Sequence, residues 1–216
     1  MDLAEYRSLY ADVPDAAPGW DAIDAELGRQ YSSQAPLHWG TVLKHMLGGP
    51  DPLDGISAYA CEDGGIRHLH FCSYGYSSLY YDEAALGGDY SRFGFEMTFR
   101  LANPPEDPVW VCSLLQNIAR YVFKSGKWFE AYQWIPTNGP IRAGHATDIV
   151  GLAFAPDATL EKIATPHGSV EFLQAFGITA SEIDALKSKA LTCQELLETH
   201  RAANPLLVTD LDRRDG

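Results

Sequence analysis

The stretch LGGPDPLDGISAY, residues 47–59, begins with a corner rich in Gly, Pro and Asp and continues into a strand-like sequence. Its first eight residues hold two glycines, two prolines and two aspartates. Such a corner can bind a phosphate, ligate a cation or fix a turn. Pro50 and Pro52 have no N–H group, so a phosphate-binding loop here would lack donors. The spacing of Asp51 and Asp54 does not match a calcium loop, and no glutamate stands at the closing position.

We therefore expect a structural turn at this corner. Glycines permit positive φ, prolines fix φ and bias the preceding residue toward extended geometry, and an aspartate before glycine hydrogen-bonds to local backbone. The turn residues are Gly48, Gly49, Pro50, Asp51, Pro52 and Asp54. Changing either of the first two glycines to valine is expected to damage folding before it damages a binding surface.

Outward from this corner, apolar residues in the middle of the chain recur with a period of two. The clearest case is FGFEMTFRL, residues 93–101, in which apolar side chains alternate with Glu96, Thr98 and Arg100 as in a half-buried strand. Strands are predicted at residues 39–45, 56–61, 66–73, 93–101, 128–135, 148–154, 161–164 and 170–176.

The first three predicted helices have clear boundaries. Residues 3–12, and a segment that begins at Pro18, carry apolar residues at three- and four-residue spacing. Asp107 before Pro108 predicts the N-terminus of a third helix, which Gly126 ends.

A last helix is predicted from a capping box formed by Thr179 and Glu182. Its apolar face continues through Cys193 to Leu197, which places that cysteine in packing. Residues 204–214 then predict a break, a short strand and a charged tail.

The arrangement of these elements predicts the fold class. Strands cluster in the middle of the chain with helices before, between and after them, so we expect an α+β fold with a mixed, mostly antiparallel central sheet and flanking helices. The 216 residues are 46% hydrophobic, which suffices for a buried core. We expect one domain over residues 1–216, with residues 1–16 as a helical extension.

The charge balance narrows the class of partner. Sixteen basic and 29 acidic residues give a formal net charge of −13, which disfavours nucleic acid because its binding relies on Lys and Arg. A basic protein partner fits this charge, and so does solubility alone. No basic signal-peptide start and no long apolar run is present, so we expect a cytoplasmic protein with no membrane contact. Four cysteines without a C-x-x-C pair indicate reduced thiols.

The common catalytic motifs are absent from the sequence, and no cofactor is expected. His68 and His70 in RHLH share one face of a predicted strand. A carboxylate, His38 or His145 would complete a metal site there, which makes a metal-dependent hydrolase the alternative function. The same two imidazoles also suit a polar sheet face that holds no ion.

The segment KWFEAYQW, residues 127–134, carries aromatic side chains on both alternating faces. Some of these rings are therefore expected outside the core. If this segment is an edge strand, it is the best candidate for capturing a peptide by strand addition.

Five ordered blocks together resemble the suppressor of fused family. LGGPDPLDGISAY is followed by RFGFEMTFRL, NIARYVFKS, TPHGSVEFLQAFGIT and LLVTDLDRR, so the resemblance spans about residues 18–214. It implies a non-enzymatic protein-binding domain similar to the N-terminal domain of the animal protein. In the animal protein, a short peptide from a Gli-type transcription factor is clamped as an added strand between two domains. This sequence is similar to the first of those domains alone.

The resemblance also implies candidate binding residues. Tyr121 falls on a tyrosine of the family's partner-binding region, and residues 128–134 fall near the peptide-facing strand. The acidic residue with which family members engage the peptide has no clear counterpart in this sequence, and Tyr132 or Gln133 stands nearby. The implied partner-binding residues are Tyr121, Trp128, Phe129, Tyr132, Gln133 and Trp134.

Three functional settings stay open. The first is a domain that sequesters or inhibits a protein partner; single-domain members of the family resemble immunity proteins of bacteria, which suggests a basic toxin domain as the partner. The second is the metal-dependent hydrolase. The third is a structural or stress-associated domain without one fixed partner.

Overall fold

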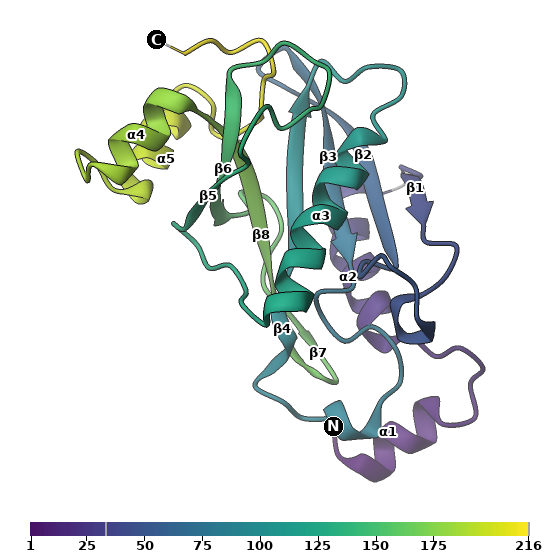
Figure 1. Ribbon diagram of the computed structural model, residues 1–216. Coiled ribbons are helices and arrows are strands. Elements are labelled where there is room, and N and C mark those ends of the chain that lie inside the picture. Colours follow the sequence, from purple (N-terminus) through teal and green to yellow (C-terminus); the bar gives the residue numbers. More distant parts are fainter. Residues whose placement is uncertain (33, 216) are drawn as a thin grey trace.

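The computed structural model describes residues 1–32 and 34–215. Its strands form one sheet in the order β1-β2-β3-β4-β8-β6-β5, with β7 paired to β8 beside this path (Figure 1). The helices are α1 (Leu3–Tyr10), α2 (Pro18–Tyr31), α3 (Trp110–Ser125), α4 (Ala180–Lys187) and α5 (Cys193–Arg201), with short 3-10 turns η1 (His45–Leu47) and η2 (Glu83–Ala85). The strands are β1 (Leu37–Gly40), β2 (Gly55–Asp63), β3 (Ile66–Tyr74), β4 (Tyr90–Ala102), β5 (Trp134–Pro136), β6 (Ile149–Pro156), β7 (Ile163–Thr165) and β8 (Gly168–Thr179).

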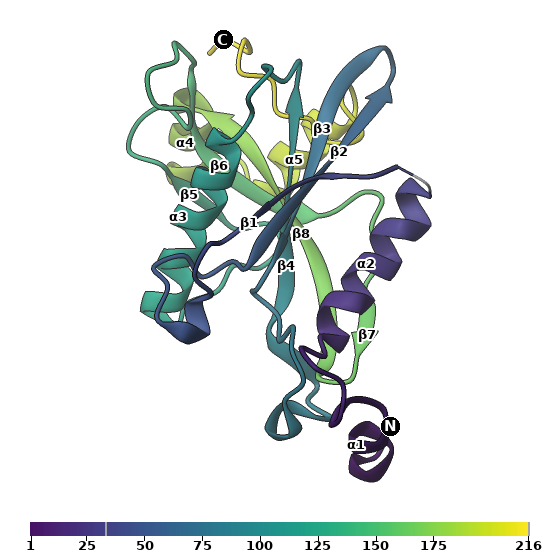
Figure 2. The same ribbon diagram turned by 90° about the vertical axis from the view of Figure 1, so that its right-hand side faces the viewer.

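The sheet is mixed and mostly antiparallel, which confirms the predicted α+β class. Only the pairing of β4 with β8 is parallel among the strand pairs of the described chain. Helices cover both faces, because α3 lies on one side of the sheet and α2 on the other (Figure 2).

Three apolar clusters hold these layers together. On one face, Leu115 and Val122 of α3 pack with Phe99 of β4. On the other face, Ile23 and Leu27 of α2 belong to a second cluster. The third cluster joins α4 and α5 to β6 and β8. Strand β4 is therefore buried on both faces from Gly94 onward, and the predicted half-buried strand is wrong in this respect.

Several predicted boundaries are wrong for local reasons. A strand was expected over residues 39–45, but the pairing of β1 ends at Gly40 and a 3-10 turn begins at His45. Helix α3 begins at Trp110, while Asp107 caps the preceding turn by accepting the Val109 N–H at 3.1 Å. Its predicted end is confirmed, since Gly126 has a left-handed φ of 69°.

The last predicted helix is two helices. Helix α4 ends at Lys187, and Lys189 has a left-handed φ of 57°. Helix α5 then starts from a second capping box, formed by Thr192 and Glu195. Cys193 lies in the apolar cluster of α5, as expected.

The strand expected near the C-terminus is absent from the described residues as a regular element. An isolated parallel bridge joins Thr209 to Leu101 of β4, and the Gln174 side chain donates to the carbonyls of Leu206 and Leu207. Hydrogen bonds from a side chain therefore hold this segment in place. The apolar periodicity of the sequence does not indicate such bonds.

The Gly/Pro/Asp corner is tied to helix α3. The Gln116 amide donates to the Leu53 carbonyl at 2.8 Å and accepts from the Leu53 N–H at 3.1 Å. Arg120 forms an ion pair with Asp51. Gly48 has a φ of 92°, whereas Gly49 does not have the predicted positive φ; a Cβ there would lie 1.9 Å from the Leu43 carbonyl oxygen. These contacts hold the Gly/Pro/Asp corner, and β2 that follows it, against α3.

Candidate protein-binding surface

The predicted partner-binding residues lie on α3, on the segment that follows it, and on β5 (Figure 1). Residues 126–133 do not form the predicted strand. Gly126 turns the chain out of α3 with a φ of 69°, and Tyr132 has a φ of 68°. Neither conformation continues a strand, so regular pairing begins at Trp134.

Phe129 is the anchor of this segment. Its side chain is buried and stacks on Phe154 of β6, with ring centroids 4.4 Å apart. On its other side lies Tyr121 of α3, at 5.9 Å and an interplanar angle of 25°. Trp128 precedes the anchor and is 54% exposed, while Tyr121 is 50% exposed. We call Tyr121, Trp128 and Phe129 the Phe129 ridge.

A pocket lies on each side of the Phe129 ridge. One, of about 550 Å³, is lined by apolar residues of α3 and of the chain after β5. The other, of about 520 Å³, lies against the first half of β4. Phe129 lines both pockets, so the ridge divides two hollows that are each large enough to accept a side chain of a partner.

The other predicted binding residues have different positions. Tyr132 is 39% exposed and lines neither pocket. The Gln133 amide is engaged with Glu130, donating to its carboxylate at 3.4 Å and accepting from its N–H at 3.3 Å. Trp134 packs with the cluster of α4 and α5, on the face of the sheet opposite Phe129. The structure thus brings together only half of the predicted set.

Strand β5 is the open edge of the sheet beside the Phe129 ridge. Gln133 accepts from the N–H of Phe154 and Thr137 donates to Val150, so these residues turn their hydrogen-bonding groups toward β6. By alternation, the backbone groups of Trp134 and Pro136 face away from the sheet. Pro136 has no N–H, so Trp134 offers the donor at this edge.

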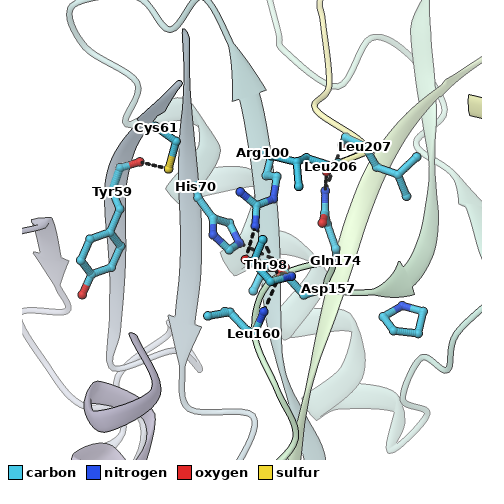
Figure 3. Close-up of polar contacts among 12 residues, drawn as sticks. Tyr59, Cys61, His70, Thr98, Arg100, Asp157, Leu160, Gln174, Leu206 and Leu207 are labelled. Carbon is cyan, nitrogen blue, oxygen red and sulfur yellow. Dashed lines mark hydrogen bonds and ion pairs between the residues drawn. The ribbon is translucent and has the colours of Figure 1, made fainter. Parts of the chain in front are cut away.

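The two histidines considered as metal ligands are buried, and His70 lies in a polar cluster with Arg100 and Asp157 (Figure 3). His70 Nε2 contacts Asp157 Oδ2 at 2.9 Å, and the His70 Nδ1 atom is hydrogen-bonded to Tyr31. Arg100 forms an ion pair with Asp157 at 3.2 Å and donates to Thr159 at 2.7 Å. All ring nitrogens of this histidine are therefore occupied by protein groups.

His68 lies on the same face, as predicted from its spacing. Its Nδ1 is paired with the Ile66 carbonyl at 3.2 Å, and its Nε2 lies 3.3 Å from Arg100. His38 instead contacts Ser57 at 3.0 Å. Across residues 1–32 and 34–215, no group of three or more His, Cys, Asp or Glu side chains is arranged to hold a metal ion. The contacts of His68 and His70 are those of a structural ion-pair network.

The protonation states in this cluster follow from burial and pairing. Burial lowers the pKa of His70, which favours the neutral ring. Burial opposes ionisation of Asp157, but His70 and Arg100 outweigh it and hold the pKa of that carboxyl well below its ordinary value. The ring lies between Tyr31 at its Nδ1 atom and the Asp157 carboxylate at its Nε2 atom. The sequence did not indicate Asp157, because its partners lie on distant strands.

Glu96 of β4 is a second buried carboxylate that sequence reasoning missed. It accepts hydrogen bonds from the hydroxyls of Ser73 and Ser77, at 2.6 and 2.7 Å, and from the N–H groups of Gly75 and Ser77. Burial raises the pKa of this carboxyl. The donors fix residues 75–77 against β4.

None of the described helices is both long enough and apolar enough to cross a membrane.

The chain is therefore an α+β domain in which helices cover both faces of a mixed sheet. Its exposed aromatic ridge lies beside an open strand edge. The suppressor of fused family model matches residues 49–214, and the chain belongs to this family. Suppressor of fused homologs of Mus musculus and Homo sapiens are each 35% identical over 98% of this chain. The match covers 50% of each homolog, so the chain spans about half their length.

Solved structures agree with this assignment. A crystal structure of a Sufu-Fu complex matches with a TM-score of 0.84 and 33% identity, covering 93% of each chain. The Drosophila Suppressor of Fused crystal structure matches with the same score and identity, covering 93% of this chain and 51% of that one. A putative homolog from Neisseria gonorrhoeae, 12% identical with a TM-score of 0.60 and coverage of 91% and 96%, shows the fold alone.

Proposed function

We propose that this chain is a non-enzymatic protein-binding domain that sequesters or inhibits a partner by occluding it. The observation that carries the proposal is the Phe129 ridge, in which the buried Phe129 ring stacks with half-exposed Tyr121, is preceded by half-exposed Trp128, and lines two pockets. Aromatic residues in such positions are typical of binding hot spots. A related chain was solved in a Sufu-Fu complex, which supports a protein as the partner.

The proposed binding mode is the addition of a peptide strand at β5. A peptide there would receive the Trp134 N–H and place side chains in the pockets beside Phe129. Because β5 has three residues and includes Pro136, this edge offers few hydrogen bonds. Side-chain contacts with the ridge therefore supply most of the affinity. We propose that residues 1–216 act as one domain, with residues 1–16 as an extension.

The proposed setting is cytoplasmic, with toxin immunity as one form of inhibition. The support is the net charge of −13, which favours a basic toxin domain through faster association. An inhibitor that works by occlusion needs no catalytic group, which agrees with the structural roles of His68 and His70.

The test is affinity capture of a partner from source cells by the full chain, followed by binding measurements on variants. Tyr121→Ala and Trp128→Ala are each expected to weaken binding by about 2 kcal/mol, or roughly thirtyfold, because truncated hot-spot aromatics cost this much. Val42→Ala is the control, since this fully exposed apolar residue lies in the loop between β1 and η1. Unchanged affinity in both aromatic variants would remove the proposal's support.

A further inference from the structure

Strand β4 contains an irregularity near its start. Its pairing with β8 shifts register between Tyr90 and Phe95. Within this interval Arg92 has a φ of 54° and Gly94 a φ of 78°. The left-handed conformation is unfavourable for a residue with a Cβ, and bulges of this kind change the direction of a side chain. The bulge turns Arg92 out of the regular strand pattern.

The Arg92 side chain is positioned but unpaired. Its guanidinium carbon lies 4.4 Å from the ring centroid of Phe123 at the end of α3, and 5.5 Å from that of Phe93. In the described part of the chain it forms no ion pair and donates no hydrogen bond. Cation–π contact with the rings positions the guanidinium, and the carboxylates of Asp54 and Glu96 act on its charge without a hydrogen bond to it.

Arg92 lies at one end of the pocket of about 520 Å³ beside the Phe129 ridge. We call this pocket the Arg92 groove; it includes Arg92, Phe93, Phe95, Trp128, Phe129 and Glu130. Glu171 pairs with Lys162 at 3.0 Å, whereas Glu130 accepts from the neutral Gln133 amide at 3.4 Å. Arg92 is thus the cation of a groove that also carries aromatic rings.

We propose that the Arg92 groove binds a short segment of a protein partner that places an acidic side chain on Arg92 and an adjacent aromatic side chain against Trp128. The inference rests on the proposed protein-binding function and adds the chemistry of the bound segment. A carboxylate matches the two parallel N–H donors of a guanidinium. The net charge of −13 does not oppose this local contact, because exposed charges are screened beyond about 8–10 Å.

The first test compares three synthetic peptides with the full chain. The acidic peptide is acetyl-SEFES-amide, and its matched controls are acetyl-SQFQS-amide and acetyl-SKFKS-amide. Binding is followed by tryptophan fluorescence and by two-dimensional NMR. The acidic peptide is expected to bind at least tenfold more tightly than either control and to shift the signals of Arg92 and Trp128. Equal affinities, or tighter binding of the lysine peptide, would overturn the inference.

The second test changes the protein. Arg92→Gln is expected to lose at least tenfold in affinity for the acidic peptide, while Arg92→Lys retains part of it. Arg142→Gln is the matched control, since Arg142 also lies over an aromatic ring, that of Trp110 at 5.6 Å, outside the groove. Circular dichroism checks that each variant folds. If a variant misfolds, the comparison of the three peptides on the unchanged chain tests the inference.

The two proposals fail differently. If Tyr121→Ala weakens binding of the captured partner while the acidic peptide shows no preference, only the acidic specificity is wrong. If no specific partner is captured, the proposed function is wrong; if a partner is captured and both ridge variants keep full affinity for it, the proposed site on the ridge is wrong, whatever the peptides show.

Discussion

Asp157 shows how one buried residue organises several elements. Its carboxylate is fully buried, accepts from Thr98 at 2.8 Å, and is paired with His70 and Arg100 (Figure 3). These partners come from β3 and β4, whereas Asp157 directly follows β6. No local spacing joins them in the sequence, so only the strand order of the sheet brings the charges together.

Asp157→Asn is expected to lower the free energy of unfolding by about 3–5 kcal/mol, because it leaves the buried Arg100 without its counterion. Urea unfolding measures this change. Glu161→Gln is the control: its carboxylate is 78% exposed and lies 3.7 Å from Arg29, so its loss should cost at most about 1 kcal/mol. If the free energy of unfolding of Asp157→Asn lies within 1 kcal/mol of that of the original chain, the network does not stabilise the fold.

Gly49→Val is expected to destabilise the fold by more than about 2 kcal/mol, because the added Cβ would overlap the Leu43 carbonyl. Gly28→Ala is the control, since an added Cβ in α2 meets nothing within 4 Å and alanine favours a helix by roughly 0.5–1 kcal/mol. Thermal unfolding measures the stability of both variants. A Gly49 variant that folds normally yet loses its partner would show that the corner is part of the binding surface.

At the level of elements, local signals predicted most of the fold. The strand at residues 93–101 and the Gly126 end of α3 are both confirmed, although the strand is buried on both faces. The break between α4 and α5 was missed because the apolar face continues across it, although the second capping box, Thr192 with Glu195, was a readable signal. The aromatic segment before β5 was mistaken for a strand, since β propensity does not report the left-handed φ of Tyr132.

The candidate site was less predictable than the fold. Tyr121 and Phe129 were named from the family resemblance, and the structure stacks their rings. Arg92 was not indicated, because its role depends on a bulge and on Phe123 from another element. Trp134 was expected on the same surface, but the alternation of β5 places it on the opposite face.

Glu182 links α4, α5 and the C-terminal segment. Burial opposes its ionisation, but His200 and Arg213, each at 2.6 Å, lower its pKa from 4.5 to about 2. Since the folded pKa is depressed, the stabilisation is present above pH 4.5 and is lost as pH falls toward 2. Urea unfolding between pH 6 and 2.5 should show a drop of up to about 3 kcal/mol that Glu182→Gln makes shallower.

The matched control for this pH dependence is Glu195→Gln. Glu195 occupies the same position in the capping box of α5 but is exposed and contacts no cation in the described chain. Hydrogen bonds from Thr192 lower the pKa of Glu195 as well, but no cation adds to that shift, so Glu195→Gln should change the acid slope less than Glu182→Gln does. Equal slopes in the original chain and Glu182→Gln would contradict the assigned ion pairs.

The whole molecule consists of a scaffold held together by buried contacts and a proposed binding edge at β5. Helices cover both faces of the sheet (Figure 2), and buried charges tie β3, β4 and the turn after β6 together. The exposed aromatic residues of the Phe129 ridge are concentrated beside β5, between two pockets. The central claim is therefore that a protein partner binds at this edge.

Hydrogen exchange of the full chain, alone and with the partner obtained by affinity capture, tests this claim most directly. The account predicts slower exchange of the Trp134 amide and of residues 128–132 in the complex, with unchanged exchange in β1 at the opposite edge of the sheet. Protection confined to β1, or to the exposed faces of α4 and α5, would contradict it.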